Sequence, residues 1–219
     1  MKPFAACRLY TFIDTAYLDG RDVATLAQQL CDGGSDVIQL RAKHSTADDI
    51  RRMTERILPI TNRAGVGLVI NDHPDITRET GAMACHLGQE DFFDAGHTAA
   101  TAVTGRPPAF QLGLSTHAPA QAERALRAGP DYIAIGPIHA TPTKATARPV
   151  TLDYVRWAAA RVQVPWFAIG GITLQNLDSV LEAGARRVCV VSAILRAPDV
   201  ADACQQFRRR LLSAPLTSG

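Results

Sequence analysis

Eight short runs rich in β-branched and aromatic residues recur along the chain, and an amphipathic helical pattern follows each of them. The runs cover residues 8–13, 36–41, 67–72, 84–88, 110–115, 132–136, 166–171 and 187–192. Several helical patterns, such as "APAQAERALRAG", end in the glycine expected just past a helix C-terminus. Strand and helix repeated eight times in this length predict an α/β fold of the (β/α)₈ TIM-barrel type. An open doubly wound sheet has the same local pattern, but no GxGxxG turn follows the first run, which favours the barrel.

The length and composition fit one globular domain. The 219 residues, 47% apolar and 20% charged, suit a single domain over 1–219 with a short tail from about residue 213. A net charge of +2 is too small to indicate a nucleic-acid partner. Neither a signal peptide nor about 18 uninterrupted apolar residues occurs, so we expect a cytoplasmic protein with no membrane partner. A homodimer stays open.

The cysteines and histidines do not form a recognisable metal or catalytic spacing. Five scattered cysteines without a CxxC pair predict neither disulfides nor a zinc site, and Cys85 and Cys189 are interpreted as inert buried thiols. His86 lies in an apolar run and is predicted to be a core or near-core residue. His117 and His139 lie nearer the expected site without triad spacing, and a general-base role for either stays open.

Polar residues and glycines follow nearly every predicted strand. In a barrel these positions meet at one mouth, where the active sites of this fold lie. The residues at these ends are Gln39, Arg41, Lys43, Asn71, Asp72, Gly88 to Asp91, Ser115, His117, Gly136 to Lys144, Gly170, Gly171, Val191 and Ser192. Their concentration predicts a ligand site at the carboxyl ends of the strands.

The charged members of this set predict an anionic ligand and a hard cation. Arg41, Lys43 and Lys144 place three cations at one rim, which an anion such as a diphosphate would offset. Asp72 and Asp91 could share Mg²⁺ together with substrate phosphates. Each aspartate alone would be better explained as a helix cap or loop anchor, but opposite three cations the metal site becomes the better interpretation.

The glycine pair after the seventh predicted strand indicates a phosphate site. Gly170-Gly171 and Val191-Ser192 each precede a helical pattern, and backbone N–H groups after strands seven and eight commonly bind phosphate in such barrels.

Seven motifs in this order resemble the thiamine-phosphate synthase (thiamine-phosphate pyrophosphorylase) family over essentially the whole chain. They are "QLRAK" (39–43), "INDH" (70–73), "HLGQED" (86–91), "LGLSTH" (112–117), "YIAIGPIHATPTK" (132–144), "AIGGI" (168–172) and "VVSAI" (190–194). The resemblance implies a transferase of thiamine biosynthesis that joins an aminopyrimidine diphosphate to a thiazole phosphate, plain or carboxylated, and releases pyrophosphate.

The resemblance also implies a role for each matching residue. The implied pyrimidine diphosphate site is Gln39, Leu40, Arg41, Ala42, Lys43, Asn71, Ser115 and Lys144, of which Arg41, Lys43, Ser115 and Lys144 would be catalytic. The implied thiazole phosphate site is Thr141, Pro142, Thr143, Gly171, Val191 and Ser192. Asp72 and Asp91 would hold Mg²⁺ as the cofactor. Cations and Mg²⁺ would stabilise the leaving diphosphate, so a dissociative substitution without a covalent enzyme intermediate or an essential general base is expected.

The chain departs from the family pattern at a few positions, none of them an implied ligand. His73 stands where the family usually has arginine, Ala84-Cys85 replace Gly-Val, and His139-Ala140 replace an aromatic residue and proline. Three alternatives are weighed: a thiazole tautomerase of the same fold, a catalytically silent ligand-binding homologue, and a generic phosphate-binding aldolase or epimerase barrel. The cations and aspartates disfavour the tautomerase, and no strand carries an obvious Schiff-base lysine.

Overall fold

Eight parallel strands form a closed barrel in which each strand pairs with its neighbours in chain order, and β1 pairs with β8. The computed structural model describes residues 1–140 and 150–213. The strands are β1 (Leu9–Asp14), β2 (Val37–Arg41), β3 (Gly67–Asn71), β4 (Ala84–Gly88), β5 (Gln111–Thr116), β6 (Tyr132–Ile135), β7 (Trp166–Ile169) and β8 (Val188–Cys189). The predicted (β/α)₈ fold is therefore confirmed.

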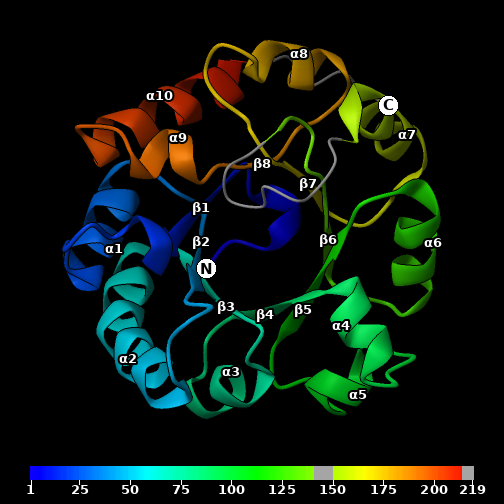
Figure 1. Ribbon diagram of the computed structural model, residues 1–219, viewed down its shortest axis with the longest axis horizontal. Helices are drawn as coiled ribbons and strands as arrows, with labels where there is room; N and C mark the ends of the chain where they lie inside the picture. Colours follow the sequence, from blue (N-terminus) through cyan, green and yellow to red (C-terminus); the bar gives the residue numbers. More distant parts are fainter. Residues whose placement is uncertain (141–149, 214–219) are drawn as a thin grey trace.

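Helices surround the barrel as a ring when it is viewed end-on (Figure 1). The helices are η1 (Phe4–Ala6), η2 (Thr15–Tyr17), α1 (Val23–Asp32), α2 (Ala47–Ala64), α3 (Pro74–Thr80), α4 (Gln89–Asp94), α5 (Thr101–Thr104), α6 (Pro119–Arg127), α7 (Thr151–Arg161), α8 (Leu177–Glu182), α9 (Ser192–Leu195) and α10 (Val200–Ser213). Within the described residues, none of them is long and apolar enough to cross a membrane.

The longest helix shows how the sequence sets its own boundaries. The Thr46 side chain accepts from the Asp49 N–H, and the Asp49 side chain accepts from the Thr46 N–H. These two bonds form a capping box at the start of α2. At the other end Gly65 adopts a left-handed φ of 68°, which glycine allows without a steric penalty. Apolar residues at helical spacing, Ile50 and Ile57 among them, are buried against the barrel.

The last two predicted strands are the ones that the structure shortens most. The run at 187–192 forms a strand only over Val188–Cys189, and Ser192 already begins α9. After β7, the helix expected directly behind the glycine pair begins at Leu177, because Asn176 first closes a turn by accepting from the Thr173 N–H. Apolar character continues through both exits, so the pattern alone does not mark where pairing stops.

Aromatic rings fill the barrel interior near its amino end. Tyr10, Tyr132 and Phe167 are fully buried and contact one another, with the Phe167 centroid 5.3 Å from Tyr10 and 5.6 Å from Tyr132. Phe4 of η1 closes the floor, 4.1 Å from the ring of Tyr132. Gly113 makes room for this layer, because a Cβ there would lie 2.1 Å from the Tyr132 ring. Burying each such ring stabilises the fold by about 1.5–3 kcal/mol.

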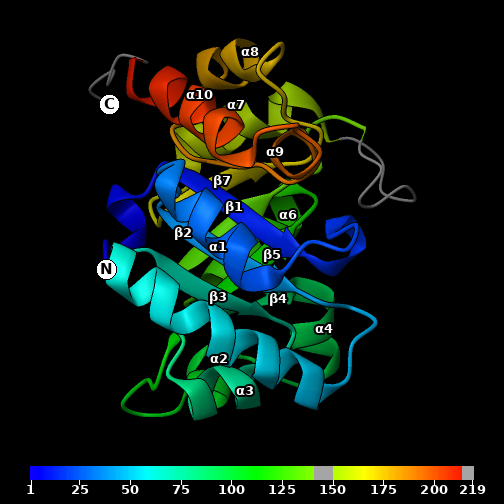
Figure 2. The same cartoon turned by 90° about the vertical axis from the view of Figure 1, so that its left-hand side faces the viewer.

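The plugged floor leaves the opposite end of the barrel for ligands. In Figure 2 the N-terminus and η1 lie at one end of the strands, and the loops that follow β1 and β2, together with α4, extend toward the other. That second end is the carboxyl end, where the sequence places its polar residues.

Candidate active site

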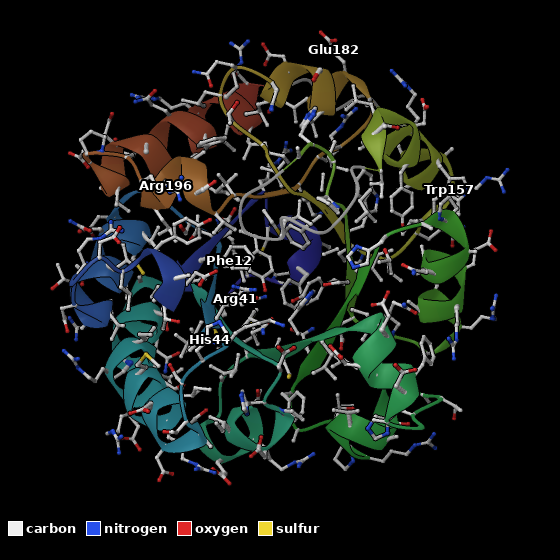
Figure 3. All side chains as sticks on the ribbon, in the orientation of Figure 1. Phe12, Arg41, His44, Trp157, Glu182 and Arg196 are labelled. Carbon is white, nitrogen blue, oxygen red and sulfur yellow. The ribbon has the colours of Figure 1, made fainter. Side chains whose placement is uncertain are left out.

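One pocket opens at the carboxyl ends of the strands and extends down to the aromatic layer. Figure 3 shows Phe12 and Arg41 inside the ring of strands, whereas Trp157, Glu182 and Arg196 lie on the outer helices. The pocket is lined by residues from all eight strands and their exits, including Tyr10, Phe12, Gln39, Arg41, Lys43, Asn71, Asp72, His86, Gly88, Asp91, Ser115, His117, Ala134, Gly136, Pro137, Ile169, Gly170, Gly171, Cys189, Val191 and Ser192.

Arg41 is held in this pocket by a carboxylate on the neighbouring strand. Its Nη1 lies 2.7 Å from Oδ2 of Asp14, and the register of β1 and β2 pairs these two residues directly. The Asp14 side chain is 1% exposed and also accepts from the N–H of Ala16, while the Arg41 side chain is 16% exposed. One end of the ion pair is thus fixed in the core, and the guanidinium faces the pocket.

Lys43, Asp72 and Asn71 form a second polar group across β2 and β3. Lys43 Nζ lies 3.4 Å from Asp72 Oδ2, and Asn71 Nδ2 donates to the same oxygen at 2.6 Å. Asp72 has a φ of 64°, a left-handed conformation that is uncommon outside glycine, and its N–H donates to the carbonyl of His86. A strained backbone that turns a carboxylate into a pocket is typical of functional sites.

Asp91, in the first turn of α4, brings a second carboxylate to the pocket from β4. Its Oδ2 lies over Gly88, where an added Cβ would come within 2.6 Å. Within the described ranges 1–140 and 150–213, no group of three His, Cys, Asp or Glu side chains could hold a metal on its own. Two carboxylates facing one pocket suit Mg²⁺ bound jointly with substrate oxygens, which is the usual arrangement for this ion.

A chain of hydrogen bonds crosses the barrel beneath the charged rim. Gln39 Nε2 donates to the Tyr10 hydroxyl at 2.7 Å, and the Tyr10 and Tyr132 oxygens lie 3.0 Å apart. Tyr132 Oη lies 2.9 Å from His86 Nδ1, and His86 Nε2 lies 2.7 Å from Ser115 Oγ. Two predicted pyrimidine ligands, Gln39 and Ser115, are thereby connected through the interior of the barrel.

His117 lies on the β5 side of the pocket with a defined orientation. Its Nδ1 contacts the carbonyl of Gly136, which can only accept, so Nδ1 carries the proton. Its backbone N–H donates to Gln121 Oε1 at 2.7 Å. The ring is therefore anchored on its Nδ1 side.

The glycine pair after β7 is required by close packing of the exit of β6. Gly170 and Gly171 have φ values of 103° and 63°. A Cβ on Gly170 would lie 2.4 Å from Pro137, and one on Gly171 would lie 2.6 Å from the carbonyl oxygen of Ala140. The carbonyl of Gly171 accepts from Asn176 Nδ2 at 2.8 Å. Small size here lets two strand exits meet at the pocket wall.

Most residues singled out in the sequence come together in this pocket. Gln39, Arg41, Lys43, Asn71, Asp72, Asp91, Ser115, Gly171, Val191 and Ser192 line it. Leu40 and Ala42 are 1% and 6% exposed and do not line it, because alternate strand residues point away from the barrel interior. Thr141, Pro142, Thr143 and Lys144 lie outside the described residues.

The cationic rim differs from its sequence-based interpretation in one respect. The cations were expected to need an external anion, yet Arg41 and Lys43 each have an aspartate partner. A bound anion would therefore compete with, or bridge over, existing ion pairs.

Strand β1 contributes site residues that were not predicted from the sequence. Tyr10, Phe12 and Asp14 alternate along β1, and the first two line the pocket while Asp14 supports Arg41. Their period of two was the available signal, because it places them on one face of a barrel strand. His86, predicted as a core or near-core residue, is 7% exposed and also lines the pocket.

A closed eight-stranded barrel with charged, amide and hydroxyl groups at its carboxyl mouth defines a (β/α)₈-barrel enzyme. Sequence comparison names the family within this class. The family described as thiamine monophosphate synthase matches residues 9–194, and the chain belongs to that family.

Individual relatives agree with this assignment. The chain is 48% identical over 180 residues to the thiamine-phosphate synthase of Thermus thermophilus, which covers 82% of this chain and 84% of the relative. It is 42% identical over 212 residues to that of Acidothermus cellulolyticus, covering 96% and 97%. The solved structure of a thiamine phosphate pyrophosphorylase from Pyrococcus furiosus has the same fold, with a TM-score of 0.84 at 24% identity over 95% and 96% of the two chains.

Proposed function

We propose that this chain is a thiamine-phosphate synthase. It joins 4-amino-2-methyl-5-hydroxymethylpyrimidine diphosphate to 4-methyl-5-hydroxyethylthiazole phosphate, or to the carboxylated thiazole, and yields thiamine phosphate and pyrophosphate. Membership of the family supports this activity. The observation that carries the proposal is that cations (Arg41, Lys43) and carboxylates (Asp72, Asp91) share one pocket with the uncharged ligands Gln39 and Ser115.

The diphosphate binds at the cationic rim. Arg41 offers a planar fork that matches phosphate oxygens, and Lys43 adds a mobile point charge, with Lys144 joining them by the family resemblance. Because Asp14 already orients Arg41 at 2.7 Å, the guanidinium needs little reorganisation when the anion arrives.

We infer that Asp72 and Asp91 would hold Mg²⁺ when the diphosphate is bound. When bound, the ion neutralises charge on the leaving diphosphate. Asp72 is suited to this role because its side chain is 33% exposed and its left-handed backbone turns it into the pocket. Lys43, now paired with Asp72, can transfer its contact to the phosphate oxygens.

The reaction is a substitution at the methylene carbon of the pyrimidine. The bond from this carbon to the diphosphate oxygen breaks, and its electron pair leaves with the diphosphate. The thiazole nitrogen then supplies the pair for the new carbon–nitrogen bond. Since the aminopyrimidine can delocalise positive charge on the methylene, a dissociative path needs neither a covalent enzyme intermediate nor a general base. Residues of the chain bind, orient and stabilise the separating charges.

The thiazole phosphate binds on the opposite side of the mouth. Gly171, Val191 and Ser192 line that side of the pocket. Thr141, Pro142 and Thr143 are proposed to complete the phosphate site by the family resemblance alone. This division places the two substrates on facing walls, as a transfer between them requires.

The activity is tested with the purified protein, both substrates, and either Mg²⁺ or a chelator. Thiamine phosphate is read as its fluorescent thiochrome and pyrophosphate by a coupled enzyme. Equal amounts of both products, formed only with the metal, are expected. Failure to form thiamine phosphate under saturating substrates would refute the proposed function.

A matched pair of variants tests the carboxylate assignment. Asp72→Asn keeps the size and the hydrogen-bond acceptor but removes the charge facing the pocket, and we expect a fall in kcat/KM of about 10²-fold. Asp75→Asn makes the same change three residues away, where Asp75 is exposed and pairs with Arg51 on the outer surface. Equal effects of the two changes would contradict a role for Asp72 at the metal.

A further inference from the structure

The buried chain of hydrogen bonds connects Tyr10, Tyr132 and His86, and it ends at the hydroxyl of Ser115 in the pocket. Tyr132 does not line the pocket, and its hydroxyl is enclosed between Tyr10 and His86. Tyr10, Tyr132 and His86 occupy β1, β6 and β4, so the chain depends on the closed barrel. A polar path this deep costs folding free energy unless each member is satisfied.

Protons can be assigned along the chain from the Gln39 end. The amide nitrogen of Gln39 can only donate, so the Tyr10 oxygen accepts from it. The remaining partner of Tyr10 is Tyr132, so the single Tyr10 proton is donated there. Tyr132 in turn has its one proton left for His86 Nδ1 at 2.9 Å. Burial raises the pKa of both tyrosines well above the usual value, which keeps each hydroxyl protonated.

The assignment fixes the tautomer of His86 and the direction of the last bond. With Nδ1 accepting from Tyr132, the ring proton lies on Nε2, which donates to Ser115 Oγ at 2.7 Å. Ser115 then has its own hydroxyl proton free for a group in the pocket. If Ser115 instead donated to His86, only its lone pairs would face the pocket, and these would repel an anionic diphosphate. The charge of the ligand therefore also favours a bond in which His86 donates and Ser115 accepts.

We propose that Tyr10 and Tyr132 act as positioning residues that hold His86 in its Nε2-protonated tautomer and so make Ser115 a hydrogen-bond donor to the leaving diphosphate. This inference rests on the proposed function. The hydrogen bond from Ser115 strengthens as charge develops on the leaving oxygen, so its loss lowers kcat more than it raises KM.

The tautomer is measured directly by NMR on the wild-type protein with ¹⁵N-labelled histidine. Long-range ¹H–¹⁵N correlations distinguish the protonated from the bare ring nitrogen, and the His86 signal is assigned by its loss in His86→Gln. We expect protonation on Nε2. Protonation on Nδ1 would overturn the proposal, and this measurement does not depend on any catalytic activity.

Kinetics of Tyr132→Phe and Tyr10→Phe provide the second test, because each variant keeps the ring and removes one hydroxyl. We expect kcat to fall about 10- to 100-fold, with KM for the pyrimidine diphosphate within about threefold of wild type. The His86 spectrum of Tyr132→Phe should lose the single Nε2-protonated form. Wild-type kcat in both variants would refute the positioning role, even if the wild-type enzyme has the proposed activity.

Tyr154→Phe is the matched control. Tyr154 of α7 is 3% exposed and does not line the pocket, and its hydroxyl bonds to Thr116 Oγ1 at 2.7 Å, apart from the hydrogen bonds that connect Gln39 to Ser115. The change therefore removes an equally buried phenol hydrogen bond without touching the chain to Ser115. Its melting temperature should fall by an amount similar to that of Tyr132→Phe, while kcat stays within about twofold of wild type. If kcat falls equally in both variants, loss of packing explains the effect and the proposal fails.

Discussion

A single methyl group at Gly88 tests whether the position of the Asp91 carboxylate matters. Gly88 has a φ of −63°, which any residue can adopt, so alanine fits the backbone without strain. Its Cβ would lie 2.6 Å from Asp91 Oδ2, whereas ordinary van der Waals contact begins at 3.4 Å. The carboxylate must therefore move by about 0.8 Å.

This displacement predicts a catalytic defect without a loss of stability. A misplacement of about 1 Å in a catalytic group can cost about 10²-fold. For Gly88→Ala we expect kcat/KM at subsaturating Mg²⁺ to fall about 10- to 100-fold, or about 1.4 to 2.7 kcal/mol of transition-state stabilisation. The melting temperature should stay the same or rise, because alanine lowers the entropy of the unfolded chain.

A double-mutant cycle separates this explanation from simple blockage of the pocket. Product formation is measured across a Mg²⁺ titration for Gly88→Ala, Asp91→Asn and the double variant. If the methyl acts through Asp91, it adds little once Asp91→Asn is present. Additive effects, or a raised KM for the pyrimidine diphosphate at saturating Mg²⁺, would refute the reasoning.

Three further outcomes follow from the buried polar groups. Asp14→Ala leaves Arg41 without its partner and should lower the free energy of unfolding by about 2 kcal/mol in urea titrations; an unchanged value would contradict the buried ion pair. Burial raises the pKa of Asp36, but hydrogen bonds from Lys2 and two backbone N–H groups outweigh it, so the pKa lies below its ordinary 3.8. The ionised Asp36 carboxylate therefore stabilises the fold above pH 3.8, and this stabilisation is lost as the pH falls. The loss in free energy of unfolding that Asp36→Asn causes at pH 7 should shrink below about pH 4. Burial raises the pKa of Cys85 to about 12, so mass spectrometry should find it unmodified by iodoacetamide at pH 8 until urea unfolds the protein.

The sequence predicts the barrel and the rim because both depend on local patterns. Alternating strand and helix patterns predict the fold, and the polar residues that follow each strand come together at one mouth in any such barrel. Arg41, Asp72 and Ser115 were placed in this way, and each of them lines the pocket. Their positions at the strand ends were enough to predict that they belong to the site.

Partners within the barrel could not be predicted in the same way. The Asp14–Arg41 pair spans 27 positions and the Tyr10–Tyr132 bond spans 122, and both depend on register and side-chain direction. Tyrosines in an apolar run are equally well explained by packing, so their hydroxyls gave no separate signal. The same applies to His86, where burial and a functional contact coexist.

Because β8 and β1 pair over a short seam, the return of activity during refolding should mark the time at which the barrel closes. Within the part of the chain that the structure describes, this seam consists of Leu9 paired with Val188 and Tyr10 paired with Cys189, at sequence separations that make such contacts slow to form. The chain from Gln39 to Ser115 needs strands from both halves of the ring. A partly assembled chain, with its early strands paired but its ring still open, would therefore lack the site, and regain of turnover during refolding would report the moment of closure.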